Sequence, residues 1–462
     1  MIELSVAEVA GVVAGRLAGA DPAARVTGGV EYDSRKVGPG GLFVAFAGEH
    51  VDGHDFGPAA VAAGAVAVLG TRVVDGVPTV LVDDPLRAMA VLARAVVDRL
   101  PGLTVIGLTG SSGKTTTKDL IGQVVAESGP TVAPAGTANN ELGHPYTVLR
   151  AGPDTRYLVL EMGARGVGHI RYLCEIAPPR IGVVLNVGVA HIGEFGSVEQ
   201  IAVAKRELVE ALPADGLAIL NADDPRVAAM ASGTPARVVT VGESAGAEVR
   251  AVDVVLDGQG RPAYTLVTPE GSAPVRLALA GRHQVGNTLV AAAVGRELGV
   301  PPADLADRLA RLRLLSTRRM DVFDRPDGVT VIDDSYNANP GSVAAALHAQ
   351  AALGRDRRRV AVLGYMAELG EYERAGHEEV GRLAATLGVE LLITVGDGAE
   401  PIQDGAVAVA SWGGKPVRVS DQEQAVALLR DELRGGDVVL VKGSRYRTWA
   451  IADALREPEP RA

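Results

Sequence analysis

The residues whose types and spacing most clearly suggest chemistry lie at 109–116, with the sequence TGSSGKTT. They follow a short apolar run that is typical of a buried strand, and a helical pattern follows them. Gly110 and Gly113 allow a tight turn in which successive backbone N–H groups face inward around a phosphate. Lys114 would then reach the outer phosphates of a nucleotide, and the Thr115 hydroxyl would bind Mg²⁺. The segment therefore predicts a nucleoside triphosphate site.

The spacing departs from the usual P-loop, which would have a glycine where this chain has Leu108. What remains is the shorter form G-x-x-G-K-T. The alternative is an ordinary Gly/Ser-rich turn between a strand and a helix, but the order of strand, loop, Gly-Lys-Thr and helix favours the nucleotide site. The predicted phosphate contacts are Gly110, Ser111, Ser112, Gly113, Lys114, Thr115 and Thr116.

Further polar residues follow the strands of the same region, where ligands lie in parallel sheets. Glu161 ends an apolar strand and is well placed to hold Mg²⁺. His191 alone would more often be structural, but its place beyond a strand end favours a functional role. Asn139 and Asn140 lie in a neighbouring loop, and Lys205 lies in a helical stretch where a solvated role is the simplest interpretation.

These residues must be positioned by alternating strands and helices, which predict a mostly parallel sheet covered on both faces. Residues 248–281 change to short extended runs, and we expect a β-hairpin insertion there. The expected strands of the sheet are 104–108, 157–161, 181–186, 217–220 and 238–241.

A small α/β unit is expected to precede this sheet, with Ser5 capping a helix over 6–17. Its polar stretches are interpreted as a binding region for a charged ligand, although a solvated loop is the alternative. The candidate contacts there are Ser34, Arg35, Asp52 and His54. Residues after 315 repeat the α/β alternation, and the tail 457–462 is expected to be disordered.

Composition limits the possible functions. With 462 residues we expect three domains, at 1–84, 85–314 and 315–462. The net charge of −11 argues against a nucleic-acid-binding surface. No apolar run approaches about 20 residues, and the N-terminus lacks the basic start of a signal peptide, so we expect a cytoplasmic protein without membrane insertion. The single cysteine, Cys174, excludes an internal disulfide.

The chain resembles the Mur ligases, ATP-dependent enzymes of bacterial cell-wall synthesis that form amide bonds. The shortened loop is similar to that family's own P-loop. The stretch 333–340 (DDSYNANP), together with 33–35, 52–54 and 139–140, is more selective. It resembles the branch that adds D-alanyl-D-alanine to UDP-N-acetylmuramoyl tripeptide, over essentially the whole chain. The resemblance implies an α/β fold with a small N-terminal α/β domain, a central P-loop ATPase-like parallel sheet and a C-terminal Rossmann-like domain.

The resemblance also implies roles for individual residues. Lys205 would carry a carbamate that binds a second Mg²⁺, beside a first ion held by Thr115, Glu161 and His191. Arg319 would reach the ATP phosphates, and Lys114, Glu161, His191, Lys205 and Arg319 would form the catalytic set. The remaining nucleotide contacts would be Asn287, Asp333, Tyr336 and Asn337, and the uridine-nucleotide substrate would meet Ser34, Arg35, Asp52, His54, Asn139 and Asn140.

The activity implied is transfer of the ATP γ-phosphoryl group to the tripeptide carboxylate, followed by attack of the dipeptide amine, in a monomer with small-molecule substrates. The chain departs from the family at Tyr365, where an aspartate is usual. Two alternatives remain: another ligase of this architecture, such as another Mur ligase or folylpolyglutamate synthetase, and a non-catalytic nucleotide-binding protein or switch. The first-domain motifs argue against the former, and the catalytic set argues against the latter.

Overall fold

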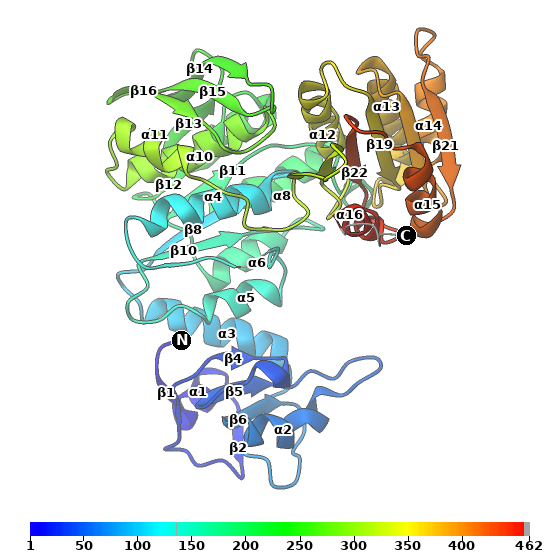
Figure 1. The fold of residues 1–462 in the computed structure, drawn as a ribbon. Coiled ribbons are helices and arrows are strands. Elements are labelled where there is room, and N and C mark those ends of the chain that lie inside the picture. The colour runs from blue at the N-terminus through cyan, green and yellow to red at the C-terminus, as the bar shows by residue number, and fades with distance from the viewer. Residues whose placement is uncertain (135, 457–462) are drawn as a thin grey trace.

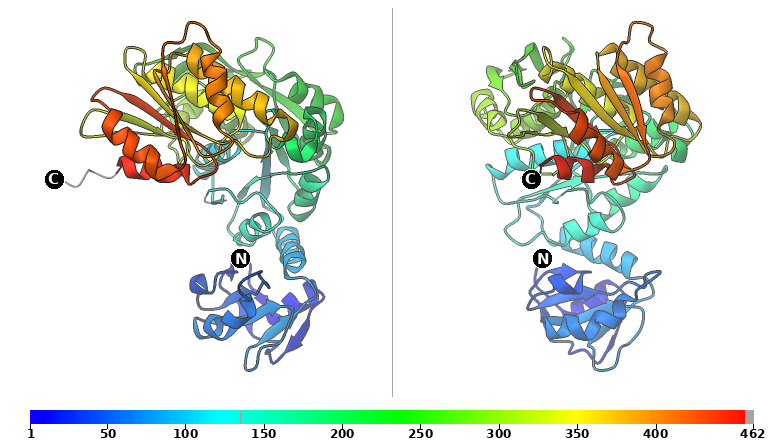
Figure 2. Two further views of the ribbon diagram at one scale, coloured as in Figure 1. Left: turned by 90° about the vertical axis from the view of Figure 1, so that its right-hand side faces the viewer. Right: turned by 45° about the vertical axis from the view of Figure 1, so that its right-hand side comes forward.

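The computed structural model describes residues 1–134 and 136–456, so the expectation for the tail 457–462 lies outside the described residues. Three large sheets follow one another along the described part of the chain and form the first, central and third domains (Figure 1). The first domain lies at one end of the molecule and the third domain lies beside the central one, as two further views also show (Figure 2). The predicted three-domain α/β fold is confirmed.

The main sheet of the first domain has five strands in the order β2-β7-β6-β5-β4, all parallel except β2. Its elements are β2 (Arg16–Ala18), β4 (Val30–Glu31), β5 (Gly41–Val44), β6 (Ala65–Gly70), β7 (Thr79–Leu81), α1 (Val6–Val12), α2 (Gly57–Ala62), and the pair β1 (Leu4–Ser5) and β3 (Arg25–Val26).

The helix expected over 6–17 is shorter than predicted. Ser5 caps it together with Glu8, as the sequence suggested, but the helix ends at Val12. Ala14 then takes a left-handed conformation with φ of 52°. A Cβ at Gly15 would lie 2.9 Å from the Val80 side chain, so the chain leaves the helix to pass close to β7.

The central domain has nine strands in the order β16-β15-β14-β13-β12-β11-β8-β10-β9. The strands β14, β13, β12, β11, β8, β10 and β9 run parallel to one another. β15 runs antiparallel to both of its neighbours, β14 and β16. The predicted hairpin region is therefore not separate but extends the same sheet at its edge. The bounds are β8 (Thr104–Thr109), β9 (Thr131–Val132), β10 (Tyr157–Glu161), β11 (Ile181–Val184), β12 (Leu217–Asn221), β13 (Arg237–Gly242), β14 (Val249–Leu256), β15 (Pro262–Thr268) and β16 (Gly271–Arg276).

Alternate residues of the central strands face two apolar cores, because side chains along a strand alternate between its faces. Leu158 and Leu160 belong to the core that also includes first-domain residues, whereas Val159 belongs to the core beneath α4 and α10. The helices are α3 (Pro85–Asp98), α4 (Lys114–Ala126), α5 (Gly143–Val148), α6 (His169–Ile176), α7 (Ile192–Phe195), α8 (Val198–Glu210), α9 (Pro225–Ala228), α10 (Gln284–Glu297) and α11 (Pro302–Ala310).

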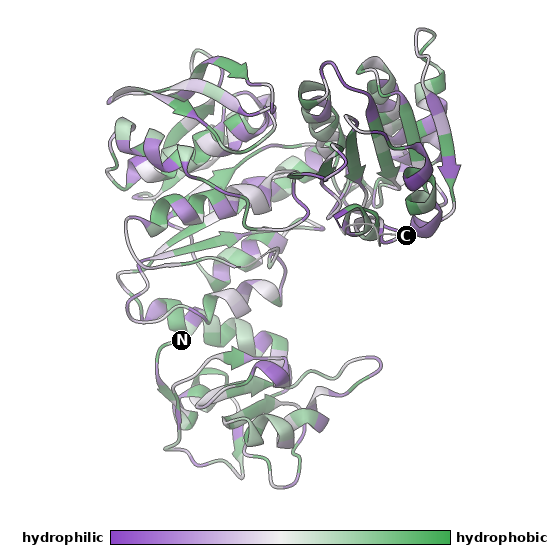
Figure 3. Ribbon diagram, in the orientation of Figure 1, coloured by the Kyte–Doolittle hydropathy of each residue, from purple (hydrophilic) through white to green (hydrophobic). Residues whose placement is uncertain are grey.

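The third domain has six strands in the order β17-β18-β22-β19-β20-β21, parallel except for β17. Its inner strands are strongly hydrophobic (Figure 3), because apolar cores cover both faces of the sheet. The bounds are β17 (Asp321–Asp324), β18 (Thr330–Asp333), β19 (Arg359–Gly364), β20 (Leu391–Val395), β21 (Lys415–Val419), β22 (Val438–Lys442), α12 (Pro340–Leu353), α13 (Glu373–Thr386), α14 (Glu400–Val407), α15 (Gln422–Glu432) and α16 (Thr448–Arg456).

Among the described residues, no helix combines the length and the apolar character that crossing a bilayer requires.

Candidate active site

A cavity of about 530 Å³ lies at the carboxyl ends of the central strands and against the third domain. Most of the residues predicted from the sequence line it. These are Ser111, Ser112, Gly113, Lys114, Thr115, Thr116, Asn139, Asn140, Glu161, His191, Lys205, Asn287, Arg319, Tyr336 and Asn337.

The loop between β8 and α4 gathers donors for an anion. Gly113 takes φ of +80°, a conformation that favours glycine, and α4 begins at the next residue. The backbone N–H groups of Ser111 and Ser112 both donate to Asn186 Oδ1, at 3.0 and 2.9 Å. Two N–H groups that converge on one oxygen are arranged as for a phosphate oxygen. The sequence had not singled out Asn186, which follows β11.

Lys114 is the first residue of α4 and is only partly exposed. Its Nζ donates to the Gly110 carbonyl at 2.8 Å, although Gly110 itself does not line the cavity. Burial lowers the pKa of Lys114, while the nearby Glu161 carboxylate raises it. The Lys114 ammonium group has therefore lost much of its hydration and has the Glu161 carboxylate nearby. A bound phosphate would add further negative charge close to it and so stabilise its protonated form.

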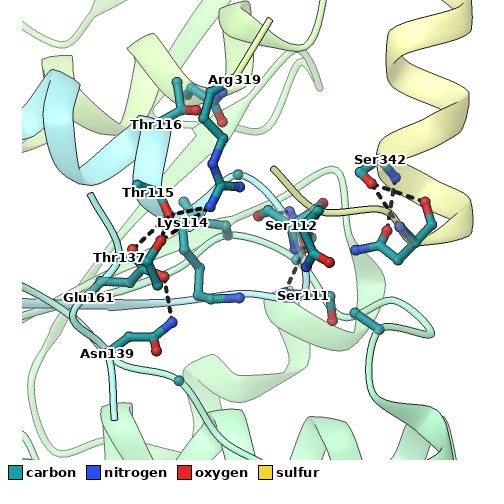
Figure 4. A pocket seen from close by; sticks show the side chains of 18 of the residues that line it. Ser111, Ser112, Lys114, Thr115, Thr116, Thr137, Asn139, Glu161, Arg319 and Ser342 are labelled. Carbon is teal, nitrogen blue, oxygen red and sulfur yellow. Dashed lines mark hydrogen bonds between the residues drawn. The ribbon is translucent and has the colours of Figure 1, made fainter. Parts of the chain in front are cut away.

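The end of β10 places a buried carboxylate beside the loop (Figure 4). Glu161 is 1% exposed and accepts hydrogen bonds from Thr115 Oγ1 at 2.9 Å and from Asn139 Nδ2 at 2.7 Å. Thr137 extends the network, with its Oγ1 2.9 Å from that of Thr115. Thr137 was missed because a lone threonine in a loop has no distinguishing sequence signal.

The third domain contributes Arg319 to this network (Figure 4). Its guanidinium donates to Thr115 Oγ1 at 3.1 Å and to Thr137 Oγ1 at 3.2 Å. It also lies over the Tyr336 ring, 4.1 Å from the centroid, in a cation–π contact. Arg319 thus brings a positive charge from one domain to the hydroxyl and carboxylate groups of another.

His191 and Lys205 line the same cavity. His191 caps α7 with φ of 61°, and its Nδ1 pairs with Glu368 of the third domain. Burial lowers the pKa of His191, with a further contribution from Lys114. Lys205, on α8, is 5% exposed, and burial lowers its pKa well below 10.5, again with repulsion from Lys114.

The oxygen atoms of Thr115 and Glu161 could provide part of a Mg²⁺ site. Among residues 1–134 and 136–456, no three His, Cys, Asp or Glu side chains gather closely enough to hold a metal ion. Mg²⁺, however, is usually bound by one or two carboxylates together with substrate phosphates and water. The buried Glu161 carboxylate in contact with the Thr115 hydroxyl is such a partial site.

Two adjacent aspartates of the third domain point to different places. Asp333, predicted to reach ribose, does not line the cavity; its Oδ1 accepts from Ser335 Oγ at 2.5 Å, and burial raises its pKa. Asp334 does line the cavity, where it pairs with the buried Lys442. A strand alternates its side chains, so the DD pair alone could not indicate which aspartate faces the ligand.

The predicted first-domain contacts lie away from this cavity. His54 is 1% exposed, its Nδ1 is 2.6 Å from Asp52 Oδ1, and its Nε2 accepts from the Thr71 N–H at 2.8 Å. Asp52 also accepts from Arg72 at 2.9 Å. His54 and Asp52 therefore hold the polar loop in place, and direct contact of His54 with a ligand stays a prediction.

Ser34 and Arg35 begin a short 3₁₀ helix just after β4. Arg35 donates side-chain and backbone hydrogen bonds to Asp33, which lower the pKa of Asp33 to about 2. The Arg35 side chain is 87% exposed, which leaves most of its guanidinium facing solvent. The predicted binding segment thus presents a positive charge at the surface of the first domain.

The unusual Tyr365 lies outside the main cavity. Its hydroxyl donates to Glu373 at 2.5 Å, and its ring stacks on His377 with centroids 5.2 Å apart. His377 Nε2 in turn accepts from the Met366 N–H at 2.9 Å. Tyr365 is therefore held by the third domain's own side chains.

Comparisons with known proteins identify the family of the chain. Three family models match: the Mur ligase family, catalytic domain, over residues 27–96; the Mur ligase middle domain over 108–295; and the Mur ligase, glutamate ligase domain, over 318–445. Two similar proteins are named UDP-N-acetylmuramoyl-tripeptide–D-alanyl-D-alanine ligase. The one from Mycobacterium tuberculosis H37Rv is 50% identical to this chain over 98% of both chains, and the one from Escherichia coli K12 is 35% identical over 99% of both chains.

Solved structures lead to the same family. A crystal structure of MurF from Acinetobacter baumannii matches with a TM-score of 0.88 and 30% identity, over 98% of this chain and 99% of that one. MurF ligase from Thermotoga maritima in complex with ADP matches with a TM-score of 0.81 and 30% identity, over 93% and 97%. The fold, the cavity and these similarities together place this chain in the Mur ligase family.

Proposed function

We propose that this chain is an ATP-dependent ligase that joins D-alanyl-D-alanine to UDP-N-acetylmuramoyl tripeptide, giving the pentapeptide, ADP and phosphate. Relatives named for this activity match nearly the whole chain. The observation that carries the proposal is the meeting of Lys114, Glu161 and Arg319 in one cavity, because two domains must come together to form it. Such an assembly suits a reaction that brings ATP and two further substrates into contact.

The first step is attack of a tripeptide carboxylate oxygen on the γ-phosphorus of ATP, which gives an acyl phosphate and ADP. A carboxylate is otherwise a poor acyl donor, because it is anionic and stabilised by resonance. The dipeptide amine then attacks the acyl carbon, phosphate leaves, and the amine loses a proton. The product keeps the new amide bond.

The chain's own residues contribute mainly charge and position. Lys114 and Arg319 would bind and neutralise the phosphate oxygens, and the N–H groups of Ser111 and Ser112 would join them on exchanging Asn186 Oδ1 for a phosphate oxygen. Mg²⁺, held by Thr115, Glu161 and His191 when bound, would supply further neutralisation of the phosphates. Arg319 would act only while the third domain is docked, so docking would couple chemistry to the exclusion of water.

The nucleoside would lie between the central and third domains. Asn287 lines the cavity beside Gly113, and a Cβ built on Gly113 would be 3.1 Å from the Asn287 Oδ1 atom. Tyr336 and Asn337 line the third-domain side. We assign adenine recognition to Asn287 and keep ribose recognition by Asp333 as part of the proposal.

Lys205 is proposed to carry a carbamate. Only a neutral amine attacks CO₂, and burial lowers the pKa of Lys205 toward that neutral form. The amine nitrogen would bond to the carbon of CO₂ and lose a proton, which turns a buried cation into an anion near Lys114. That anion would suit a second Mg²⁺.

Incubation with ¹³CO₂ should give a carbamate ¹³C NMR signal in the wild type that Lys205→Met lacks. An identical signal in both proteins would contradict the assignment of the carbamate to Lys205.

The UDP-linked substrate is proposed to begin at the first domain and to end in the cavity. The exposed Arg35 and the neighbouring Ser34 offer contacts for its anionic groups, and the loop held by Asp52 and His54 lies in the same domain. The acceptor carboxylate would then reach Lys114 past Asn139 and Asn140.

The test is phosphate release from ATP in the presence of Mg²⁺ and UDP-N-acetylmuramoyl tripeptide, measured with and without D-alanyl-D-alanine. We expect release that depends on the dipeptide, with a pentapeptide product by mass. Release with a single amino acid in place of the dipeptide would move the chain to another branch of ligases. Tight ATP binding without release under any condition would favour the nucleotide-binding switch.

A further inference from the structure

A short segment of the central domain connects the catalytic carboxylate to the first domain. It runs from Asn139 to Tyr146 and includes most of α5. At its start, Asn139 donates to Glu161 through its side chain at 2.7 Å and accepts from the Gly163 N–H through its carbonyl at 2.9 Å. A Cβ on Gly163 would lie 2.9 Å from Asn139 Cγ, so this end of the segment is closely packed.

The middle of the segment is held by its own hydrogen bonds. Asn140 Oδ1 accepts from the Gly143 N–H at 2.8 Å, and its carbonyl accepts from the His144 N–H at 2.9 Å. His144 is fully buried, and burial lowers its pKa to about 4, which keeps its ring neutral at physiological pH. The segment therefore has little freedom to shift between its two ends.

At its other end, the segment crosses to the first domain. The Tyr146 hydroxyl donates to Glu31 Oε2 at 2.8 Å. The Tyr146 ring also packs edge-on against Tyr32, with centroids 4.9 Å apart, and Tyr32 packs against Phe46. Burial and the Glu31 carboxylate both raise the pKa of Tyr146, so its hydroxyl remains a donor at neutral pH.

These contacts lie next to the proposed binding segment of the first domain. Glu31 is the last residue of β4, and Ser34 and Arg35 follow it within four residues. An apolar core also joins the two domains. Because the hydrophobic effect has no preferred direction, apolar packing tolerates small rotations of one domain against the other. A hydrogen bond has a preferred direction and distance, so the Tyr146–Glu31 contact can select one orientation.

We propose that Tyr146 is a positioning residue, which holds the first domain in the orientation that delivers the tripeptide carboxylate to the γ-phosphate near Glu161. The inference rests on the proposed placement of the UDP-linked substrate across the first and central domains. The UDP group would bind within the first domain whatever its orientation. Only the far end of the substrate, where the reaction occurs, would be misplaced by a rotation.

Tyr146→Phe in the full-length protein tests this, because it removes the hydroxyl and keeps the ring. We expect kcat to fall roughly tenfold, since small misplacements of reacting groups are costly. The Kd for UDP-N-acetylmuramoyl tripeptide and the KM for ATP should change less than about twofold, because the variant keeps the residues that contact the UDP group and ATP. Tyr157→Phe is the control, because the Tyr157 ring is buried in the same domain and its hydroxyl bonds to no other described residue.

Glu31→Gln provides the second arm, because the Gln carbonyl can still accept from Tyr146. We expect a loss of about threefold, and the double variant should be no worse than Tyr146→Phe alone, since both remove one interaction. Equal kcat in Tyr146→Phe and the wild type would overturn the inference. A loss of substrate binding as large as the loss of kcat would overturn it as well. An inactive wild type would instead refute the proposed function.

Discussion

Glu161 is the residue on which the central part of the site depends, because it links Thr115 of the P-loop to Asn139 of the neighbouring loop. A carboxylate that is 1% exposed is costly to keep ionised unless a cation or several donors compensate it. The two donors and the nearby Lys114 supply part of that compensation. Substrate-bound Mg²⁺ would supply the rest.

Glu161→Gln should therefore leave the fold intact and lower dipeptide-dependent phosphate release by roughly 10² to 10³-fold, because the amide keeps the shape but not the charge. Release assays at saturating ATP and Mg²⁺ measure this effect. Glu175→Gln, on the exposed face of α6, is the matched control and should retain full activity. Equal activity of the two variants would rule out a charge role for Glu161.

Lys205 should cost the protein stability, because its burial favours the neutral amine. Between its lowered folded pKa and 10.5, the unfolded chain binds more protons at Lys205 than the folded chain. The penalty is therefore fully present at low pH and disappears as the pH rises toward 10.5.

Lys205→Met should consequently raise Tm at neutral pH by a few degrees, and this gain should shrink toward pH 10.5, each pKa unit being worth about 1.4 kcal/mol. The same variant should lose nearly all ligase activity. Thermal melts from pH 6 to 10.5 in buffer depleted of CO₂ measure the effect. A gain that does not vary with pH would show that the charge of Lys205 is not its cause.

At the scale of elements, α7 and the 3₁₀ turn η4 (Gly370–Tyr372) bring the backbones of the central and third domains into close contact. The Gly193 N–H donates to the Glu368 carbonyl at 2.9 Å, next to the side-chain pair of His191 and Glu368. A Cβ on Gly193 would lie 2.8 Å from the Gly370 nitrogen. This contact depends on glycine.

Gly193→Ala should loosen the docking of the third domain and so withdraw Arg319 from Thr115. We expect the KM for ATP to rise and kcat to fall, each by about three- to tenfold. Small-angle scattering should give a larger radius of gyration than for the wild type. Gly11→Ala on α1 has open space around its Cβ and should change none of these quantities; a similar effect in both variants would contradict the docking role.

The elements themselves could be predicted well from the sequence where the apolar pattern was strong. The strand expected at 157–161 is β10, and the P-loop lies between β8 and α4 as expected. The helix from Ser5 was predicted too long, because the close approach of Gly15 to β7 is a tertiary contact that local periodicity does not reveal. Residues 248–281 were predicted as a β-hairpin, but not the pairing of β14 with β13 that joins them to the central sheet, since register is set by distant partners.

The site could be predicted where a motif carried it, as for Lys114 and Thr115. Asn186 and Thr137 were missed because their roles depend on what the fold places opposite them. His54 was identified as a candidate, but its burial between Asp52 and Thr71 could not be seen in the sequence.

At the scale of the whole molecule, each of the three domains presents charged residues of its own. The first domain presents the exposed Arg35, the central domain presents Lys114 and Glu161, and the third domain presents Arg319. The contacts between the third and central domains include the polar pairs Arg319–Thr115 and His191–Glu368, beside the packing of Ile192 against the third domain's apolar core. Removal of nucleotide and Mg²⁺ should therefore favour undocking, visible as a larger scattering envelope; an unchanged envelope would argue against movement of this domain.

The most direct measurement of the central claim uses UDP-N-acetylmuramoyl tripeptide in which both oxygens of the reacting carboxylate are ¹⁸O. If the γ-phosphoryl group passes to that carboxylate, each phosphate released with D-alanyl-D-alanine should contain one ¹⁸O atom, because the amine displaces phosphate by breaking the acyl C–O bond. Mass spectrometry of the phosphate and of the pentapeptide product measures both. Unlabelled phosphate would mean that water, not the tripeptide, received the phosphoryl group, and would contradict the ligase mechanism.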